Sequence, residues 1–215
     1  CVLYGARRHS LRKALAALVT EGKLRVEHGR GTFVERAPLL NYVIGERTRF
    51  RENLLSQGLT ASGETLSEMK LPASTRVAAA LKIAAEAPVF ARSWRGFAND
   101  LPISTGWAYY DATRFPDLLE RRRDTRSITD VYRSYGITDY RRQSTTVLTR
   151  IASEREATML MMRPGQSVLV VQKVDADLDG RPISFSEAVW AGDRVQFTFE
   201  ADQPTVMTTE RPSDD

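Results

Sequence analysis

Alternation of polar and apolar residues dominates the chain beyond residue 60. This period-two pattern predicts strands over residues 63–71, 89–98, 103–110, 140–151, 168–178, 182–190 and 195–200. Turn-forming pairs, Asn99-Asp100 and Asp179-Gly180, lie within two of the gaps between these strands, so hairpins are expected there. Strands joined mainly by hairpins favour an antiparallel sheet.

Shorter stretches with helical spacing of apolar residues lie between the predicted strands. They predict helices over residues 9–21, 46–57, 74–85 and 127–135, and a broken helical stretch over 111–123. Ser153 and Glu156 form a capping-box pattern that predicts one more helix, which ends before Pro164. Helices interspersed with an antiparallel sheet make the predicted fold class α+β.

A small hairpin is predicted directly after the first helix. Residues 24–27 and 32–34 alternate around the turn Gly29-Arg30-Gly31, which places Arg30 at the tip. Positive charge gathers in the same segment: residues 1–36 hold eight Lys and Arg against three Glu, whereas the rest of the chain has a slight negative excess. Such asymmetry favours a polyanionic partner for this segment, although a solvated basic face would carry the same charge.

Two sequence motifs in this segment favour a polyanionic partner over a solvated basic face. Arg8-His9-Ser10-Leu11-Arg12-Lys13-Ala14-Leu15 and Gly29-Arg30-Gly31-Thr32-Phe33-Val34 closely resemble the recognition helix and wing of GntR-type repressors. In that family the helix enters the major groove and the wing tip touches the minor groove. The resemblance therefore implies a partial winged helix-turn-helix whose two preceding helices are expected to be missing. Arg7 departs from the family, which commonly has a small polar residue there.

The DNA-contacting residues that follow from this resemblance are Arg7, Arg8, His9, Ser10, Arg12, Lys13, His28, Arg30 and Gly31.

The larger remainder resembles the UTRA sensor domain of the HutC subfamily, which is similar in fold to chorismate lyase. Asp179-Gly180-Arg181-Pro182, Ser186, Gly192-Asp193-Arg194 and Phe197 match its closing hairpin. Within the subfamily, residues 49–83 are most similar to phosphonate-utilisation repressors of the PhnF type. The expected domains are a partial winged helix at 1–36, a linker at 37–45, a UTRA-type domain at 46–205 and a flexible tail at 206–215.

Candidate effector-binding residues come from the faces of the predicted strands. Alternation groups Arg92 with Trp94, Arg142 with Ser144 and Thr146, and Ser184 with Ser186 and Trp190. Guanidinium forks and hydroxyls suit a phosphate or carboxylate. The alternative is that these residues form the solvent faces of half-exposed strands, with the tryptophans in the core.

The effector is expected to be an anion. Amino-sugar sensors of the subfamily carry acidic residues aligned near Gly106 and Ser184, and this chain has none at those positions. Arginines without nearby acids favour a phosphonate or phosphate ester. Neither a metal nor a cofactor is expected, because both histidines, His9 and His28, lie in the basic segment.

These patterns leave three hypotheses. The leading one is a cytoplasmic, homodimeric repressor of phosphonate uptake or degradation genes that binds a palindromic double-stranded operator and senses a small anion. The second keeps the HutC-type regulator and changes the effector to a carboxylate or sugar phosphate. The third is a chorismate-lyase-like enzyme, for which no catalytic residue is found. A membrane span is not expected, because no apolar run approaches about 20 residues.

Overall fold

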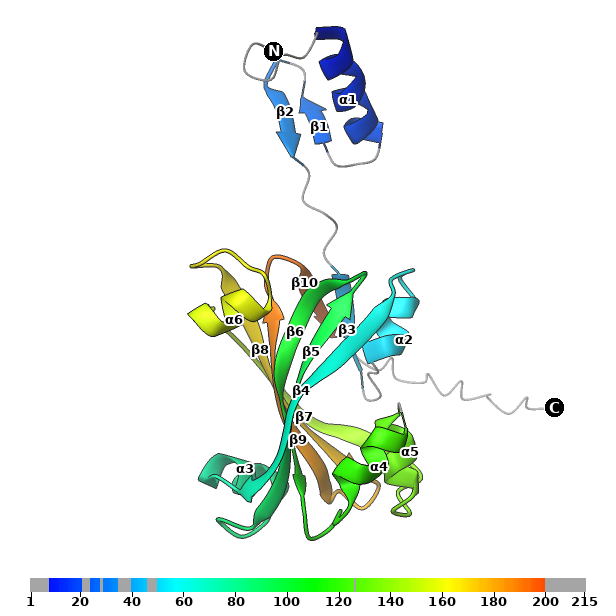
Figure 1. Cartoon of the computed structure of the whole chain (residues 1–215), viewed down its shortest axis with the longest axis vertical. Helices are drawn as coiled ribbons and strands as arrows, with labels where there is room; N and C mark the ends of the chain where they lie inside the picture. Colours follow the sequence, from blue (N-terminus) through cyan, green and yellow to red (C-terminus); the bar gives the residue numbers. More distant parts are fainter. Residues whose placement is uncertain are drawn as a thin grey trace, which may run out of the picture. The chain divides into compact units, whose positions relative to one another are not determined.

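The computed structural model describes residues 8–20, 24–27, 29–34, 40–45, 50–125 and 127–199. The chain divides into two compact units between Leu40 and Asn41 (Figure 1).

The smaller unit contains the predicted helix and hairpin. Its elements are α1 (Arg8–Thr20), β1 (Leu24–Glu27) and β2 (Gly31–Val34). The two strands pair in antiparallel fashion, with Glu27 opposite Gly31. The flanking glycines of the turn have φ values of 76° and 125°, at Gly29 and Gly31 respectively. Because side chains disfavour this left-handed region, the two glycines allow the sharp reversal that leaves Arg30 at the tip.

The larger unit is built on a six-stranded antiparallel sheet in the order β4-β5-β6-β9-β8-β7. Its strands are β4 (Ala61–Pro72), β5 (Pro88–Ala98), β6 (Leu101–Asp111), β7 (Tyr140–Ile151), β8 (Ser167–Asp177) and β9 (Pro182–Ala191). The turn between β5 and β6 has Asn99 at φ 46° and Asp100 at φ 65°, as a tight hairpin requires. The predicted α+β class with an antiparallel sheet is confirmed.

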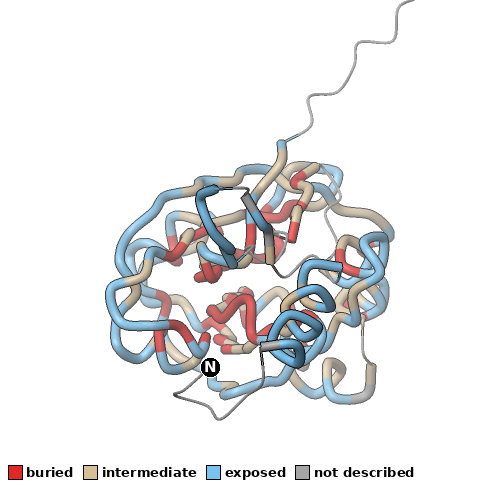
Figure 2. Tube along the Cα trace, turned by 90° about the horizontal axis from the view of Figure 1, so that it is seen from above, coloured by how far each residue is buried: buried red, intermediate tan, exposed pale blue. Residues whose placement is uncertain are grey.

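Helices cover both faces of this sheet (Figure 1). They are α2 (Phe50–Leu55), α3 (Thr75–Leu81), α4 (Leu118–Asp124), α5 (Ile128–Arg133) and α6 (Glu154–Met159). On one face, α3 packs on Phe185 and α6 packs on Val189. On the other face, α4 and α5 pack on Tyr110. Buried positions, red in Figure 2, lie along the strands between these layers.

The prediction of a linker was wrong at residues 40–44. They form β3 (Leu40–Ile44), which pairs with β10 (Val195–Phe199) in a separate two-stranded sheet. Leu40, Tyr42 and Ile44 alternate along β3 and are each 6% exposed, and the Tyr42 ring packs against Trp190 of the larger sheet. Side chains from the α2 segment hold this strand: Asn53 donates to the Val43 carbonyl at 2.8 Å.

Two helix details also differ from the sequence prediction. The helix predicted over 74–85 ends at Leu81, because Lys82 adopts a left-handed conformation with φ 55°. The helix predicted over 46–57 ends at Leu55, which is 54% exposed, whereas Leu54 is fully buried. The capping box is confirmed, with Ser153 and Glu156 exchanging both hydrogen bonds at the start of α6.

Candidate functional site

A continuous row of side chains crosses all six strands on the face covered by α4 and α5. The row consists of Glu68, Arg92, Ala108, Ser186, Lys173 and Thr145, each paired with the next on the neighbouring strand. Directly paired residues point to the same face of a sheet. Charged side chains and hydroxyl groups from distant parts of the sequence therefore line one side of the sheet.

The neighbouring rows on this face add more of the predicted residues. Arg142 pairs with Asp175, which pairs with Ser184. Trp94 pairs with Gly106, and Trp190 lies two positions beyond Ala188 on the same face of β9. Six of the eight predicted effector residues thus share this face: Arg92, Trp94, Arg142, Ser184, Ser186 and Trp190.

The placement of Ser144 and Thr146 on this face was wrong. The register of β7 shifts between Arg142 and Ser144, so that Gln143 is an extra residue. Such a bulge inverts the alternation beyond it. Thr145 therefore joins Arg142 on the inner face, while Ser144 and Thr146 are exposed on the opposite one.

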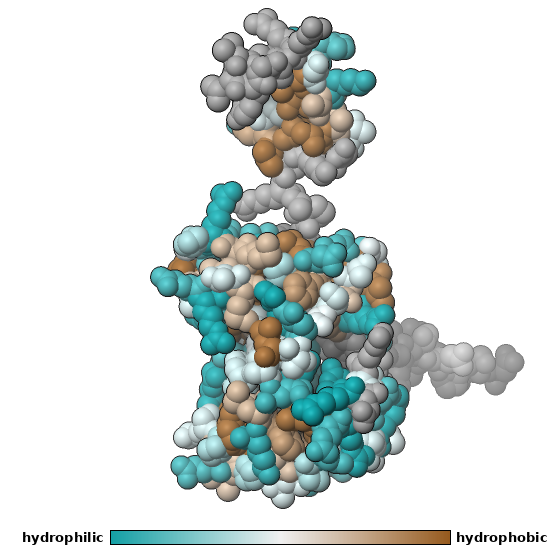
Figure 3. All heavy atoms as spheres, in the orientation of Figure 1, coloured by the Kyte–Doolittle hydropathy of each residue, from teal (hydrophilic) through white to brown (hydrophobic). Residues whose placement is uncertain are grey.

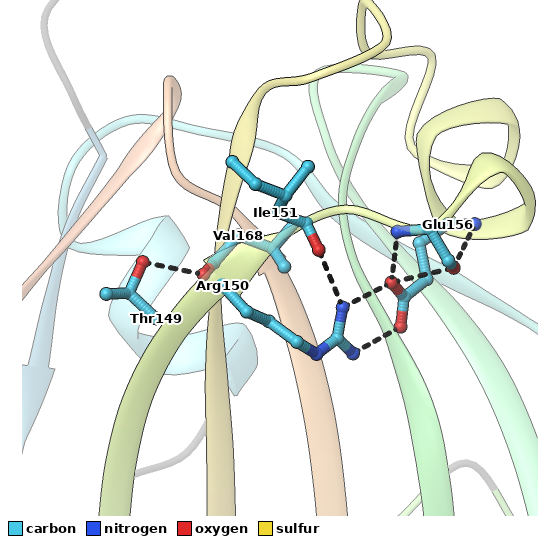
Figure 4. Close-up of polar contacts among 6 residues, drawn as sticks. Thr149, Arg150, Ile151, Glu156 and Val168 are labelled. Carbon is cyan, nitrogen blue, oxygen red and sulfur yellow. Dashed lines mark hydrogen bonds and ion pairs between the residues drawn. The ribbon is translucent and has the colours of Figure 1, made fainter.

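Arg150 follows the same inverted alternation. Its guanidinium makes two hydrogen bonds to the Glu156 carboxylate of α6, at 2.6 and 2.7 Å (Figure 4). The Arg150 side chain is therefore engaged in anchoring α6 to β7 on the side away from Arg142.

Three consecutive arginines on the covering helix α4 have three different surroundings. Arg121 pairs with Asp117 at 2.8 Å, and Arg123 reaches Glu68 on β4 at 3.5 Å. The positive charge of Arg122 acts on both Arg92 and Tyr110. Arg122 is therefore part of the candidate site although the sequence analysis did not select it.

The two arginines at this end of the face repel each other. Burial lowers the pKa of Arg92, and the positive charge of Arg122 lowers it further, whereas Tyr110 and Glu68 oppose the shift. Arg92 donates to Thr65 Oγ1 at 2.6 Å, and its Nε is 3.6 Å from Glu68. An anion between the two guanidinium groups would relieve this repulsion.

Several polar atoms of this face are buried without a hydrogen-bond partner. They are Arg92 Nε, Arg122 Nη1, Arg142 Nε, Thr145 Oγ1 and Trp190 Nε1. An unsatisfied buried polar atom costs roughly 1–3 kcal/mol, so a cluster of them on one face is unusual in a core built only for stability. The chemistry of the set, mostly guanidinium and indole N–H donors, fits an acceptor-rich ligand.

Tyrosine hydroxyls supply additional donors. Tyr110 and Tyr132 are both buried, and burial is the main cause that raises the pKa of each hydroxyl above its ordinary value. They therefore remain protonated at neutral pH and can donate to an anion.

The expectation that no acid lies near these arginines was wrong. Asp175 is 7% exposed and lies 3.4 Å from the Ser184 hydroxyl that donates to it. It is paired with Lys173 at 2.7 Å. Glu68 is the second acid, beside Arg92. These acids project from β8 and β4, whereas the positions where amino-sugar sensors carry acids, near Gly106 and Ser184, lie on β6 and β9. Cations still outnumber acids among the described residues of this face.

The two tryptophans occupy different surroundings. A Cβ at Gly106 would lie 2.9 Å from the Trp94 ring and 2.3 Å from the Glu187 carbonyl oxygen, so glycine allows Trp94 to lie close over the sheet. Trp190 packs against Tyr42, with ring centroids 4.6 Å apart. Trp190 therefore belongs to an aromatic cluster at the β3–β10 end of the face.

A hollow of about 300 Å³ lies beside the Asn99-Asp100 turn, at the end of β4 and β5 away from Glu68 and Arg92. Its lining residues are Ser62, Gly63, Glu64, Phe97 and Asp100. None of the predicted effector residues lines it. The buried unpaired donors, rather than this hollow, identify the candidate site.

The predicted DNA-contacting residues are exposed wherever the structure describes them. His9, Ser10, Arg12 and Lys13 are exposed on α1, and Arg30 and Gly31 are exposed at the hairpin turn. Arg7, His28 and the side chain of Arg8 lie outside the described residues. The smaller unit also exposes apolar side chains, including Val26 at 58% and Val34 at 81%, and brown patches mark such side chains in Figure 3.

Residues missed by the sequence analysis complete the face: Arg122, Thr145, Lys173, Asp175, Tyr110 and Tyr132. The run Arg121-Arg122-Arg123 was a usable signal, because consecutive side chains point about 100° apart around a helix and therefore meet different surroundings. No group of three or more His, Cys, Asp or Glu that could hold a metal ion occurs among the described residues. In the same part of the chain, none of the helices combines the length and apolar character that crossing a bilayer requires.

Comparison with known proteins identifies both units. Residues 56–196 match the UTRA domain, and residues 1–34 match the family of bacterial regulatory proteins called the gntR family. These families consist of transcriptional regulators rather than enzymes.

Individual relatives agree with this match. An uncharacterized HTH-type transcriptional regulator of Rhizobium meliloti (strain 1021) is 38% identical over 92% of this chain and 81% of its own length. The probable transcriptional regulator PhnF of Escherichia coli (strain K12) is 29% identical over the same shares of the two chains. The crystal structure of PhnF from Mycobacterium smegmatis superposes with a TM-score of 0.69 at 24% identity, covering 93% of this chain and 87% of that one.

Proposed function

Because this chain belongs to the UTRA-domain regulators of the gntR family, we propose that it represses phosphonate uptake or degradation genes in response to a small anion. Regulators of this family bind DNA operators and small-molecule effectors. The similarity to PhnF relatives supports phosphonate genes as the target.

The main support for an anionic effector is the set of buried guanidinium nitrogens without hydrogen-bond partners. Arg92 belongs to the sheet and Arg122 to α4, each has one of these nitrogens, and the charge of Arg122 acts on Arg92. A phosphonate or phosphate group between them would accept hydrogen bonds from both and offset their mutual repulsion. Charge-assisted hydrogen bonds of this kind contribute roughly 1.5–3 kcal/mol each.

DNA binding is assigned to the smaller unit. We infer that Arg12 and Lys13 on α1 contact phosphates or bases of the major groove, and that Arg30 at the hairpin tip contacts the minor groove. A homodimer acting in the cytoplasm would place two such units on a palindromic operator. Effector binding to the larger unit would act on them through the residues that join the two units.

The test is a thermal-shift panel on the chain, followed by gel shifts on an operator selected from random duplexes. Alkylphosphonates and phosphate esters are expected to raise the melting temperature and to change operator occupancy, while neutral sugars do neither. Arg92→Gln should abolish the anion response and retain DNA binding. Anion responses that are identical in wild type and Arg92→Gln would contradict the proposal.

A second candidate keeps the regulator and changes the effector to a sugar phosphate or a carboxylate. The observation in its favour is the pair of acids on the same face, Glu68 and Asp175, because carboxylates accept hydrogen bonds from hydroxyl groups of a ligand. The same panel separates the two: a sugar phosphate that stabilises the chain more than any alkylphosphonate favours this second candidate.

A further inference from the structure

The candidate face carries a second set of unpaired donors, separate from Arg92 and Arg122. Arg142 and Thr145 occupy adjacent inward positions of β7 on either side of its bulge. Both Arg142 Nε and Thr145 Oγ1 are buried without a hydrogen-bond partner. A guanidinium with a neighbouring hydroxyl is a suitable site for a carboxylate.

The two sets lie too far apart for one small anion to satisfy both. Three strands, β6, β9 and β8, separate β5 from β7. Four strand spacings of about 4.8 Å each therefore separate the backbones of Arg92 and Arg142. The two sets also act on different tyrosines. The charges of Arg92 and Arg122 lower the pKa of the Tyr110 hydroxyl, whereas the charge of Arg142 lowers that of the Tyr42 hydroxyl, in each case against the larger effect of burial.

An acid lies between the two sets. Asp175 projects from β8, next to Arg142 on one side and Ser184 on the other. It is buried, and Lys173 balances its charge. Asp175 is one strand away from Arg142 and three strands away from Arg92. The part of the ligand that passes Asp175 would be repelled if it were negative, whereas an uncharged chain or a hydrogen-bond donor would be accepted there.

We propose that the effector is bifunctional, with a phosphonate or phosphate group held by Arg92 and Arg122 and a carboxylate held by Arg142 and Thr145. An uncharged carbon chain, with or without a hydroxyl group, joins the two ends past Asp175. This inference rests on the proposed anion-sensing function and specifies the class of ligand. Arg142 and Thr145 then select ligands by their second end.

The test compares two matched series by calorimetry on the whole chain: unbranched alkylphosphonates, and phosphonocarboxylates of the same chain lengths from two to six carbons. At the best length, the carboxylate should tighten binding at least about tenfold over its alkylphosphonate partner. Arg142→Gln and Thr145→Val should each reduce that gain while leaving the affinity for alkylphosphonates within about twofold of wild type. Arg92→Gln should weaken both series.

Neighbouring residues on the opposite face provide matched controls. Arg141→Gln and Thr146→Val change the same side-chain types on exposed positions of β7 and should leave both series unchanged. A carboxylate that adds nothing at any chain length would overturn the bifunctional ligand but leave the anion site in place. Equal losses in both series for Arg142→Gln would also overturn it. Failure of every compound in both series to bind wild type would overturn the proposed anion site and this inference with it.

Discussion

Arg92 on β5 and Arg122 on α4 place like charges across the contact between the sheet and its covering helix. Burial and this repulsion together lower the pKa of Arg92. Each guanidinium also has a buried nitrogen without a hydrogen-bond partner. Such an arrangement is unfavourable in the free protein and becomes favourable when an anion lies between the two groups.

Removal of one of these charges should therefore stabilise the free protein. We predict that Arg122→Gln raises the free energy of unfolding in anion-free buffer by about 1 kcal/mol, or roughly 2–4 °C in melting temperature. Inorganic phosphate should raise the melting temperature of wild type. The shift that it causes in the variant should be at most half as large. Exposed Arg155 on α6 provides the control, since Arg155→Gln should respond to phosphate like wild type. A destabilised Arg122→Gln variant would contradict the repulsion.

Glu156 should make stability depend on acid pH. Its hydrogen bonds to Arg150, with smaller contributions from Ser153, lower the pKa of the Glu156 carboxyl from 4.5 to about 2. A lowered pKa in the folded state stabilises the fold above the unfolded-state pKa, and this contribution is lost as pH falls from about 4.5 towards 2.

We predict that Glu156→Gln costs about 1–2 kcal/mol at pH 7, because it weakens the capping box and the ion pair with Arg150. Denaturant unfolding at pH 3 should show roughly half of that difference or less. Glu154→Gln, in the same turn of α6, is the control and should differ little from wild type at either pH. A difference that persists undiminished at pH 3 would exclude the ionised pair as its source.

Gly106 should be intolerant of any side chain. A Cβ there would lie 2.3 Å from the Glu187 carbonyl oxygen, which belongs to the neighbouring strand backbone. We predict that Gly106→Ala destabilises the larger unit by about 1–3 kcal/mol and weakens effector binding by displacing Trp94. Thermal unfolding and ligand titration measure the two effects. Gly45→Ala is the control, since its Cβ would meet no atom within 4 Å.

Arg30 should contribute to DNA binding through charge. Arg30→Ala is expected to weaken operator binding and to lower the slope of log affinity against log salt by about one unit, because one phosphate contact is lost. Gel shifts over a salt series measure both quantities, with Arg155→Ala as a control on the larger unit. An unchanged slope would remove the hairpin tip from the DNA interface.

Dimerisation should reside in the larger unit. We predict that the chain sediments as a dimer at micromolar concentration and that its selected operator is a palindrome, since two-fold symmetry in the protein requires two-fold symmetry in the site. Analytical ultracentrifugation and operator selection test the two halves separately. A strictly monomeric protein that selects a non-repeated site would contradict the dimeric repressor.

Short-range sequence patterns were sufficient to predict the local elements and the family. Period-two alternation, the turn pairs such as Asn99-Asp100 and the capping box at Ser153 depend on interactions within a few residues, so their signals are complete in a short segment. The positive charge of residues 1–36 and the sequence motif around Arg30 can likewise be recognised within one contiguous segment. The family assignment followed from such motifs, and the domain matches confirm it.

Which side chains share the candidate face depends on strand pairing and helix packing, and it could not be predicted from the sequence. One extra residue in β7 exchanged Thr145 for Ser144 and Thr146, because a bulge is set by pairing with β8 and leaves no mark in the alternation of β7 alone. Helix packing brought Arg122 to Arg92, and strand order brought Asp175 beside Ser184. Contacts between elements far apart in the chain depend on strand pairing and packing, which local sequence patterns do not specify.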